Sequence, residues 1–461
     1  MNLLSIYMSH DGCITYIQNN KIKFHTQLDR YNKIKHSAFI SKEIIDIIKS
    51  LQIDHLLISY AEKNNSALLW EEVFTRSNFK DLKNIWINKL IRYEDKEHHL
   101  FHAYCALTWD KNIKNILVCD GTGKKLSNNK YENESYYKFI NRKIKHIKTY
   151  SNNIGNKYDN FSYNVFGDVF ANGKTMALSL HDSAAKQVQD TYEKDMFNLL
   201  KELCFNNKDT ILFTGGCAQN VLFNNKLLSN YKNVFCDPFN GDFGISLGVA
   251  NYYLNNKIKN DTVYLGIPQE INTDLFLKHK IINVTSEDVA RILLNDPVAI
   301  FQSRSEQGQR GLGNRSLLMS PINPNSNSKL NEIKKREWYR PFACSILQEK
   351  AHEWFNLLQL KESPYMMYVF NLLDNKKNIL TSGIAVNNTS RIQTVKKEQN
   401  KHFYNLLKAF EKITNIPILI NTSLNLPGEV LVETLYDLNN LFTNSNLKYI
   451  YFPEINKLVI K

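Results

Sequence analysis

Residues 210–228 have the sequence TILFTGGCAQNVLFNNKLL, and this stretch decides the fold class. Its first five residues are mostly apolar or β-branched and predict a strand over 210–214. Gly215 and Gly216 predict a tight turn, and the apolar spacing that follows predicts a helix over 218–228. A strand, a glycine turn and a helix in direct succession are typical of α/β proteins, which bind ligands at the carboxyl ends of their strands.

The same alternation extends in both directions along the chain. On the N-terminal side we expect a three-stranded meander, a helix and a strand, then a second series. Their ranges are 2–8, 13–17, 21–28, 41–51 and 55–60, then a helix over 98–109, a strand over 115–119, a hairpin over 136–150 and a helix over 183–203. On the C-terminal side we expect strands at 234–236, 298–302 and 416–420, a helix start at 241, and helices at 286–294 and 350–355. No internal repeat is visible, and a polar stretch near residues 261–285 predicts two domains, 1–268 and 269–461.

The composition excludes several classes of protein. Hydrophobic residues make up 43% of the 461 residues, which is enough for ordinary cores, and no run of 18 apolar residues indicates a membrane span. The first residues show neither a basic segment nor a cleavage site, so we expect a cytoplasmic protein. The seven cysteines include no CxxC pair, which argues against a disulfide framework and against a cysteine zinc site.

The net charge of +13 has two interpretations that the sequence leaves open. A basic surface favours a polyanionic partner such as nucleic acid, whereas an A/T-rich gene would accumulate lysine without a function. Lysine accounts for 47 of the 58 basic residues, but seven of the 11 arginines fall within residues 291–391. Because a guanidinium group binds phosphate or carboxylate with two parallel hydrogen bonds, this concentration predicts an anion pocket.

Two histidines and two aspartates form a candidate metal site. His98 and His102 are four residues apart and lie on one face of the predicted helix. Asp120 follows a predicted strand, and Asp242 begins a glycine-rich turn. Two imidazoles and two carboxylates suit Fe(II), Zn or Mn without choosing among them, and a surface helix with histidines satisfied by the protein is the alternative.

Other segments indicate phosphate binding. The Gly215–Gly216 turn offers backbone N–H groups to a phosphate, and Asn220 offers an amide to a ribose or base, although neither a P-loop nor a GxGxxG motif is present. The second half combines cations with small polar side chains, which is the chemistry of an oxyanion pocket, or alternatively of a nucleic-acid surface. These runs are GQRGLGNRS (308–316), KKREWYRPF (334–342), TSR (389–391) and NTS (421–423).

Taken together, the motifs resemble those of the O-carbamoyltransferases of the nodulation, cephamycin and tobramycin type. The matching segments follow one another over nearly the whole chain: SHDG (9–12), HHLFHA (98–103), VCDGTG (118–123), GKTMAL (173–178), FTGGCAQN (213–220), GDFGISLG (241–248), QGQRGLGNRS (307–316), IKKREWYRPFACS (333–345), NNTSRIQTV (387–395) and NTSLN (421–425). The resemblance implies an N-terminal domain of the actin/sugar-kinase type (ASKHA), similar to tRNA threonylcarbamoyl transferases. It implies a YrdC-like α/β domain at the C-terminus.

The resemblance also implies a reaction and its residues. Carbamoyl phosphate and ATP would form carbamoyl adenylate in the C-terminal domain, and an acceptor hydroxyl would take the carbamoyl group in the N-terminal domain. It implies a metal ion, Fe(II) foremost with Zn or Mn open, Mg with the ATP, and His10 as general base. The metal ligands would be His98, His102, Asp120 and Asp242, the nucleotide contacts Gly121, Lys174, Gly215, Gly216 and Asn220, and the carbamoyl phosphate contacts Arg310, Lys334, Arg391, Asn421 and Ser423.

The chain departs from the family pattern in ways that bear on the acceptor. Gln309, Gly311 and Cys344 replace family Pro, Ala and Pro residues, and AVNN (385–388) stands where a His-Val-Asp-Gly sequence is usual. After Leu178 the chain lacks a long insertion, which predicts an open acceptor side. We therefore expect a hydroxymethylated pyrimidine in DNA, such as hydroxymethylcytosine in a viral genome, with the base exposed for reaction. The alternatives are a small-molecule or sugar acceptor, and an inactive nucleotide- or nucleic-acid-binding protein; a homo-oligomer is also open.

Overall fold

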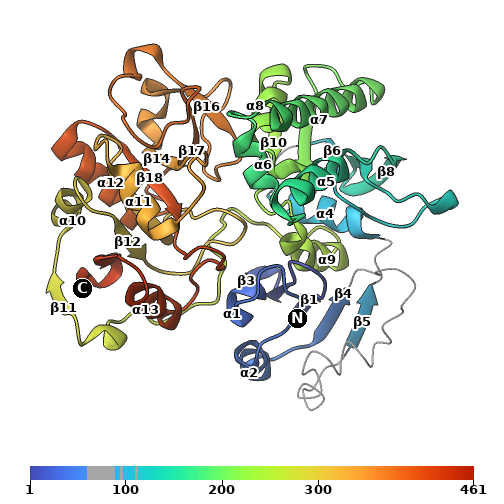
Figure 1. The fold of residues 1–461 in the computed structure, drawn as a ribbon. Coiled ribbons are helices and arrows are strands. Elements are labelled where there is room, and N and C mark those ends of the chain that lie inside the picture. Colours follow the sequence, from blue (N-terminus) through green and yellow to red (C-terminus); the bar gives the residue numbers. More distant parts are fainter. Residues whose placement is uncertain (60–88, 94–96, 110–112) are drawn as a thin grey trace. The chain divides into compact units, whose positions relative to one another are not determined.

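The computed structural model describes residues 1–59, 89–93, 97–109 and 113–461 (Figure 1). It divides into two compact units: unit 1 comprises Met1–Asn160, Tyr192–Gln219 and Tyr231–Asp261, and unit 2 comprises Phe161–Thr191, Asn220–Asn230 and Thr262–Lys461. The functional division at residues 268 and 269 stays a prediction, because the compact units follow packing and unit 2 takes two segments from the N-terminal half. No helix in the described ranges is both long and apolar enough to cross a bilayer.

Unit 1 contains two five-stranded sheets with the same topology. The first has the order β3 (Lys21–Gln27), β2 (Cys13–Gln18), β1 (Asn2–Tyr7), β4 (His55–Ser59) and β5 (Lys89–Tyr93). The second has the order β8 (Lys143–Tyr150), β7 (Glu134–Ile140), β6 (Asn115–Cys119), β9 (Thr210–Thr214) and β10 (Asn233–Cys236). Each sheet is an antiparallel meander followed by two strands parallel to the first. The structure therefore repeats a unit where the sequence shows none, and the predicted α/β class is confirmed. The actin/sugar-kinase-like character of the N-terminal part stays a prediction.

Two helices connect these sheets. The helix α4 (His98–Leu107) packs on β6 and β9, and α9 (Ile245–Tyr253) packs on β1, β2 and β4. The helices also pack on each other, side by side in Figure 1. A glycine is needed at the crossing, because a Cβ atom on Gly248 would lie 2.0 Å from the carbonyl oxygen of Phe101. The crossing fixes the start of both helices, where the predicted metal ligands lie.

The other N-terminal elements follow from local sequence signals. Ser41 caps α2 (Lys42–Ser50) by accepting a hydrogen bond from the backbone N–H of Ile44, and the helix buries Ile44, Ile45 and Ile48. The short helix α1 (Asp29–Asn32) follows β3. Two helices, α5 (Ile154–Phe166) and α7 (Ser183–Glu202), contribute residues to both units. The structure thus confirms the expected helices at 41–51 and 183–203 and adds α5, which was not predicted.

Unit 2 is built on a mixed ten-stranded sheet, in agreement with an α/β C-terminal domain; its YrdC-like character stays a prediction. In spatial order the strands are β11 (Lys280–Asn283), β20 (Lys457–Ile460), β19 (Tyr449–Phe452), β12 (Val298–Phe301), β13 (Arg315–Met319), β18 (Ile418–Ser423), β14 (Ala343–Leu347), β17 (Thr389–Val395), β16 (Val369–Leu372) and β15 (Phe355–Asn356). Its helices are α6 (Asn172–Leu178), α8 (Val221–Asn230), α10 (Ser286–Leu293), α11 (Ser326–Lys334), α12 (Lys401–Thr414) and α13 (Leu435–Thr443).

Three expectations for these elements need correction. The predicted helix around residues 350–355 is wrong: a 3-10 turn over Gln348–Glu353 leads into β15, whose Phe355 is buried. The helix expected from residue 218 begins at Val221, because Gly216–Gln219 forms a 3-10 turn before it. Residues 421–423 lie inside β18 rather than after it.

Candidate metal centre and anion site

The four predicted metal ligands come together in unit 1. One ligand atom from each of His98, His102, Asp120 and Asp242 lies within 4.8 Å of the others. The Nε2 atom of His98 is 3.2 Å from Asp120 Oδ2 and 3.4 Å from Asp242 Oδ1. The Nε2 atom of His102 is 3.5 Å and 3.4 Å from the same two oxygens. Both imidazoles are buried, so α4 does not present them at the surface, but the alternative that the protein itself satisfies these histidines stays open.

The two oxygens of the Asp242 carboxylate face different groups: one faces the ligand histidines, and the other faces His10, the candidate general base. While Oδ1 faces the two ligand histidines, Oδ2 accepts a hydrogen bond from the Tyr7 hydroxyl at 2.9 Å and lies 3.1 Å from His10 Nε2. The His10 side chain is 40% exposed, so it reaches solvent while Asp242 fixes its ring. Tyr7 was not predicted; it ends a buried strand, and the sequence gives no signal for its polar contact.

Asp120 is held in a similar way by the glycine turn. Its Oδ1 atom accepts a hydrogen bond from the backbone N–H of Gly216 at 2.8 Å, which leaves Oδ2 for the histidines. Gly215 has φ +88°, and a Cβ atom there would lie 2.2 Å from the carbonyl oxygen of Cys119. Only glycine fits this turn. The Gly216 N–H therefore already has a partner in the metal cluster, and its contact with a nucleotide stays a prediction.

In the candidate metal centre, the histidines stabilise the charged form of both aspartates. Burial by itself would raise the pKa of both aspartates, but the hydrogen bonds and charges of His98 and His102 hold the pKa of Asp120 well below its usual range. Burial likewise opposes the shift at Asp242, whose pKa is lowered by His10, His98 and His102. Both aspartates are therefore carboxylates at neutral pH, which is the form that ligates a cation.

The donor set fits a divalent metal ion. Two imidazole nitrogens and two carboxylate oxygens converge from α4, the end of β6 and the start of the α9 region, all elements fixed by packing. Fe(II), Zn and Mn all accept such a mixed set. His99, on the same helix, points elsewhere: its Nδ1 lies 3.0 Å from the Ser135 hydroxyl, as expected from the helical spacing.

The predicted nucleotide contacts belong to both units. In unit 1, the carbonyl oxygen of Gly121 accepts hydrogen bonds from the side-chain amides of Asn133 and Asn156. In unit 2, the Nζ atom of Lys174 is 2.8 Å from Glu337 Oε1. Asn220 caps α8 through the backbone N–H of Phe223 and also bonds the Gln189 side chain. Both side chains thus have protein partners in unit 2, and their nucleotide contacts stay predictions.

Unit 2 contains a cluster of guanidinium groups, which we call the arginine cluster: Arg310, Arg336, Arg340 and Arg391. Burial and the positive charges of the other three hold the pKa of Arg310 well below its ordinary range. Burial and Arg340 lower the pKa of Arg391 to about 10. Burial, Arg340 and Arg391 lower that of Arg336 to about 9.

The arginine cluster is short of negative charge. Within the part of the chain that the structure describes, Arg310, Arg336 and Arg391 form no ion pair with a carboxylate, and Arg340 alone pairs with Glu337 at 3.3 Å. Lys174 also binds Glu337, so this carboxylate is already shared. Like charges gathered without counter-ions are unfavourable unless an anion binds. Arg336 and Arg340 were visible in the KKREWYRPF run but were not among the predicted contacts.

The other predicted carbamoyl phosphate residues lie on the neighbouring strands. The Nζ atom of Lys334 donates to the carbonyl oxygens of Ser423 and Asn425, each at 2.7 Å. Asn421 donates to Ser345 Oγ and to Gln393 Oε1, while its own Oδ1 is buried and has no hydrogen-bond partner among the described residues. A Cβ atom on Gly311 would lie 2.7 Å from the Cα of Ser423, so the loop carrying Arg310 rests on this strand. Contact with carbamoyl phosphate stays a prediction for all five residues.

Arg304 and Arg315 also belong to the arginine-rich segment 291–391, but they bind backbone carbonyl groups. This corrects the expectation that the arginines of this segment serve to bind anions. The Arg315 side chain is fully buried and donates to the carbonyl oxygens of Gln302 and Ser303, among others, with its guanidinium 3.7 Å from the centre of the Phe301 ring. Arg304 donates to the carbonyl oxygens of residues 265 and 266. These side chains hold the backbone of unit 2 together.

The C-terminal part of the chain is similar to a known family. Residues 289–459 match the family described as "Carbamoyltransferase C-terminus". The nodulation protein NolNO of Sinorhizobium fredii is 26% identical over 95% of this chain and 77% of its own length. The 3'-hydroxymethylcephem-O-carbamoyltransferase of Amycolatopsis lactamdurans is 32% identical over 50% of this chain and 45% of its own length.

An uncharacterized protein of Methanocaldococcus jannaschii is 34% identical, and the chain spans only 55% of that relative's length. Among solved structures, full-length HypF in its phosphate- and nucleotide-bound form aligns with a TM-score of 0.34 at 13% identity over 56% of each chain. A putative N-acetylglucosamine kinase from Chromobacterium violaceum aligns with a TM-score of 0.31 at 8% identity, covering 54% of this chain and 98% of its own. The predicted resemblance is confirmed: residues 289–459 match the carbamoyltransferase C-terminal family, and the chain is similar to nodulation proteins and to an O-carbamoyltransferase.

Proposed function

We propose that the chain is an ATP-dependent O-carbamoyltransferase that uses carbamoyl phosphate. The observation that carries this proposal is the arginine cluster, which lies within the residues that match the carbamoyltransferase C-terminal family and is short of counter-ions. Carbamoyl phosphate and ATP are the anions that such a site would neutralise. The O-carbamoyltransferase named among the relatives supports the same reaction class.

Unit 2 would carry out the activation. One water molecule cleaves carbamoyl phosphate into carbamate and phosphate, and a carbamate oxygen then attacks the α-phosphorus of ATP. The bond from this phosphorus to the bridging oxygen breaks, pyrophosphate leaves, and carbamoyl adenylate forms. Arg310 and Arg391 would hold the phosphate oxygens as fixed positive charges in a site with little water. Asn421, with its buried Oδ1, would accept from the carbamoyl amino group.

Unit 1 would carry out the transfer. The acceptor hydroxyl oxygen attacks the carbamoyl carbon, its proton passes to His10 Nδ1, and AMP leaves with the bonding electron pair. Asp242 Oδ2 lies 3.1 Å from the other ring nitrogen, Nε2, and by accepting its N–H would orient the ring and stabilise the imidazolium. A divalent ion held by His98, His102, Asp120 and Asp242 would supply positive charge beside the reacting oxygens. Tyr7 keeps Asp242 in place for both tasks.

For the acceptor we favour a hydroxymethylpyrimidine in DNA, such as hydroxymethylcytosine. The net charge of +13 and the absence of an insertion after Leu178 support a large polyanionic acceptor. The second candidate is a small molecule or sugar, which the name of the cephem carbamoyltransferase supports. An inactive protein on the same fold is less well supported. Residues 385–388, which differ from the family pattern, form a turn before β17, and Arg391 lies in that strand.

Mass spectrometry of reaction products tests the proposal. The full chain is incubated with carbamoyl phosphate, ATP, Mg, Fe(II) and a panel of acceptors that includes hydroxymethylcytosine DNA, unmodified DNA, sugars and hydroxymethyl cephems. We expect one carbamoyl group on the hydroxymethylated DNA and none on unmodified DNA. Carbamoylation of a small acceptor alone would move the assignment to the second candidate. Absence of any carbamoylated product and of carbamoyl adenylate would overturn the proposal.

A further inference from the structure

One segment of unit 1 concentrates positive charge at the surface. Residues 121–150, all within the described ranges, contain eight lysines and arginines: Lys124, Lys125, Lys130, Lys138, Arg142, Lys143, Lys145 and Lys148. The same segment has only two acidic residues, Glu132 and Glu134, and each is 1% exposed. Its surface is therefore purely cationic. We call the hairpin β7–β8 with its turn the basic ribbon.

The basic ribbon brings like charges together on one face. Lys138 and Lys145 are directly opposite each other in the antiparallel register, and Lys143 lies opposite Ile140 next to this pair. Side chains at such positions point to the same side of the ribbon. A directly opposed pair of like charges destabilises a hairpin. The arrangement therefore costs stability in the isolated chain and would be relieved by a bound anion.

Counter-charges for this face are scarce. Lys148 pairs with Glu202 at 2.9 Å and lies over the Tyr150 ring. Lys138 lies over the ring of Tyr136, which carries no formal charge. Across the described ranges, Lys138, Lys143 and Lys145 form no ion pair with a carboxylate. All three side chains are exposed, so a partner can reach them.

We propose that the basic ribbon is the surface of unit 1 that binds the phosphate backbone of a nucleic acid. This inference deepens the proposed function and rests on it for the choice of DNA. Residues 143 and 145 are about 6.8 Å apart along the strand, a spacing that allows contacts with neighbouring phosphates. A two-stranded ribbon also fits the major groove of B-form DNA.

The composition of the ribbon favours nucleic acid over an anionic membrane. Segments that lie in a membrane interface combine lysines with exposed Trp, Phe or Leu. The large hydrophobic residues exposed on the basic ribbon are Ile140 and Ile147. Of its aromatic residues, Tyr136 and Tyr137 are buried, and Phe139 and Tyr150 are half-buried. The ribbon thus offers charge with little apolar surface to insert.

The segment is also continuous with the candidate metal centre. It begins directly after the ligand Asp120, whose backbone N–H donates to the carbonyl oxygen of Asn133 at 2.9 Å. The backbone N–H of Gly123 in turn donates to the carbonyl oxygen of Glu132. Because Glu134 pairs with Cys119 and Lys138 with Asn115, the lysines of the ribbon lie toward the other end of β6, about 14 Å along the strand from Cys119, the residue before Asp120.

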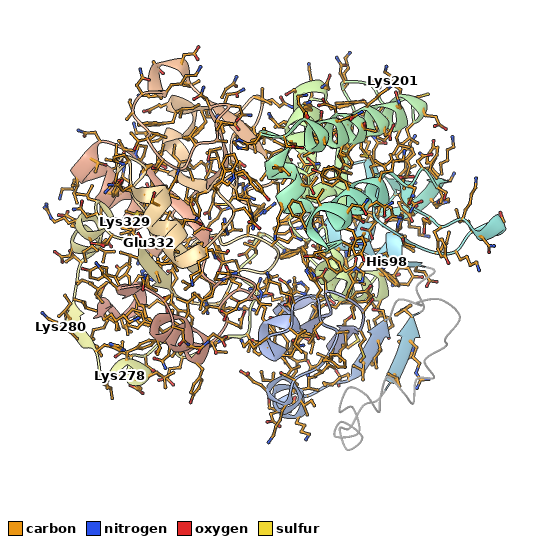
Figure 2. The ribbon with its side chains drawn as sticks, viewed as in Figure 1. His98, Lys201, Lys278, Lys280, Lys329 and Glu332 are labelled. Atoms are coloured by element: carbon orange, nitrogen blue, oxygen red, sulfur yellow. The ribbon has the colours of Figure 1, made fainter. Side chains whose placement is uncertain are left out.

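Lysines at a sheet edge also prevent edge-to-edge pairing, and β8 is the edge strand of its sheet. Replacing lysines of the ribbon with glutamine tests whether these lysines bind nucleic acid or only protect the edge of the sheet. The test variant K138Q/K143Q/K145Q removes three cations from the ribbon. The control variant K201Q/K278Q/K280Q removes three exposed lysines elsewhere (Figure 2). Both variants have the same net charge, and none of the six residues belongs to the proposed catalytic or anion site.

Fluorescence anisotropy with a labelled hydroxymethylcytosine duplex is measured from low to high NaCl. We expect the ribbon variant to bind at least about tenfold more weakly than the control, with a salt slope smaller by about 2.7, since each lost phosphate contact removes about 0.9. Equal binding by both variants would overturn the inference, as would stronger competition by phosphatidylserine vesicles than by unlabelled duplex. Carbamoyl-phosphate-dependent exchange of pyrophosphate into ATP is followed in parallel and should be unchanged. If the wild-type chain binds the duplex but shows no exchange of pyrophosphate into ATP, the proposed function is refuted and the inference about the ribbon is not.

Discussion

At the scale of single residues, arginines in unit 2 serve two purposes that substitution can separate. Arg315 donates to buried backbone oxygens, so R315A should lower the free energy of unfolding by about 3 kcal/mol or more. Arg310 is surrounded by like charges, so R310A should leave stability unchanged within about 0.5 kcal/mol, or raise it. Urea unfolding of both variants checks this. A stability loss in R310A equal to that in R315A would show that Arg310 also has a structural role.

The candidate metal centre gives a second prediction at this scale. The variant D242N keeps the shape of the side chain but removes the charge that faces both histidines, so metal affinity should fall by at least about 100-fold. Metal content after dialysis, measured by mass spectrometry of the elements, checks this without any activity assay. The exposed His352 supplies the control H352A, which should retain the metal of the wild type. Equal metal content in D242N and H352A would contradict the assignment.

How far the sequence predicts the site is also a matter of single residues. Spacing and position after strands were enough to bring together His98, His102, Asp120 and Asp242, because helices and strand ends constrain where side chains point. The partners that aim these ligands were not predictable. Tyr7 and the backbone N–H of Gly216 are distant in sequence and have no distinctive motif for that role. The two kinds of arginine differ only in burial, which is a property of the fold.

At the scale of elements, the crossing of α4 and α9 should be sensitive to one methyl group. In G248A the new Cβ atom would lie 2.0 Å from the carbonyl oxygen of Phe101, so we expect a stability loss of about 3 kcal/mol or more and weaker metal binding. A Cβ atom on Gly173 in α6 would meet no other atom within 4 Å, so G173A should be neutral or slightly stabilising. Thermal unfolding and metal content of the two variants test this. If G248A and G173A unfold at similar temperatures, α4 and α9 can move apart enough to accommodate the added methyl group, which would contradict the prediction.

The first sheet of unit 1 predicts a dependence of stability on pH. Burial lowers the pKa of His25 on β3 to about 3, so in the folded chain it stays neutral, whereas in the unfolded chain it takes up a proton near pH 6.5. The contribution of His25 is therefore lost as the pH falls below 6.5, by about 2 kcal/mol at pH 5. We expect H25Q to lose less stability between pH 7 and pH 5 than the wild type in urea unfolding, with H352Q as the control. The same pH dependence in H25Q and the wild type would contradict this.

Local signals predicted most elements of unit 1 but not their duplication. Strands such as 115–119 and 210–214 are apolar runs bounded by glycine or aspartate, and the structure confirms them. The two sheets share their topology through pairing between distant strands, and their sequences have no common pattern to reveal it. The wrong helix at 350–355 shows the same limit, because Phe355 pairs with Leu372 in a strand contact that no local signal indicates.

At the scale of the whole molecule, the two units carry almost equal shares of the net positive charge. Unit 1 has 31 basic and 24 acidic residues, and unit 2 has 27 and 21. The distribution within each unit is uneven, since unit 2 gathers guanidinium groups at one site and unit 1 gathers lysines on the basic ribbon. Average composition therefore fits an A/T-rich gene, whereas the two local concentrations favour bound anions. We relate the first to carbamoyl phosphate and ATP, and the second to a polymer.

The most direct test of the account is exchange of labelled pyrophosphate into ATP by the full chain. We expect exchange that requires carbamoyl phosphate, is lost at least about 100-fold in R391Q, and is kept in R291Q, which removes an exposed arginine of α10 outside the cluster. Exchange in the wild type that does not depend on carbamoyl phosphate, or equal exchange in R391Q and R291Q, would contradict the claim that unit 2 activates a carbamoyl group through its arginine cluster.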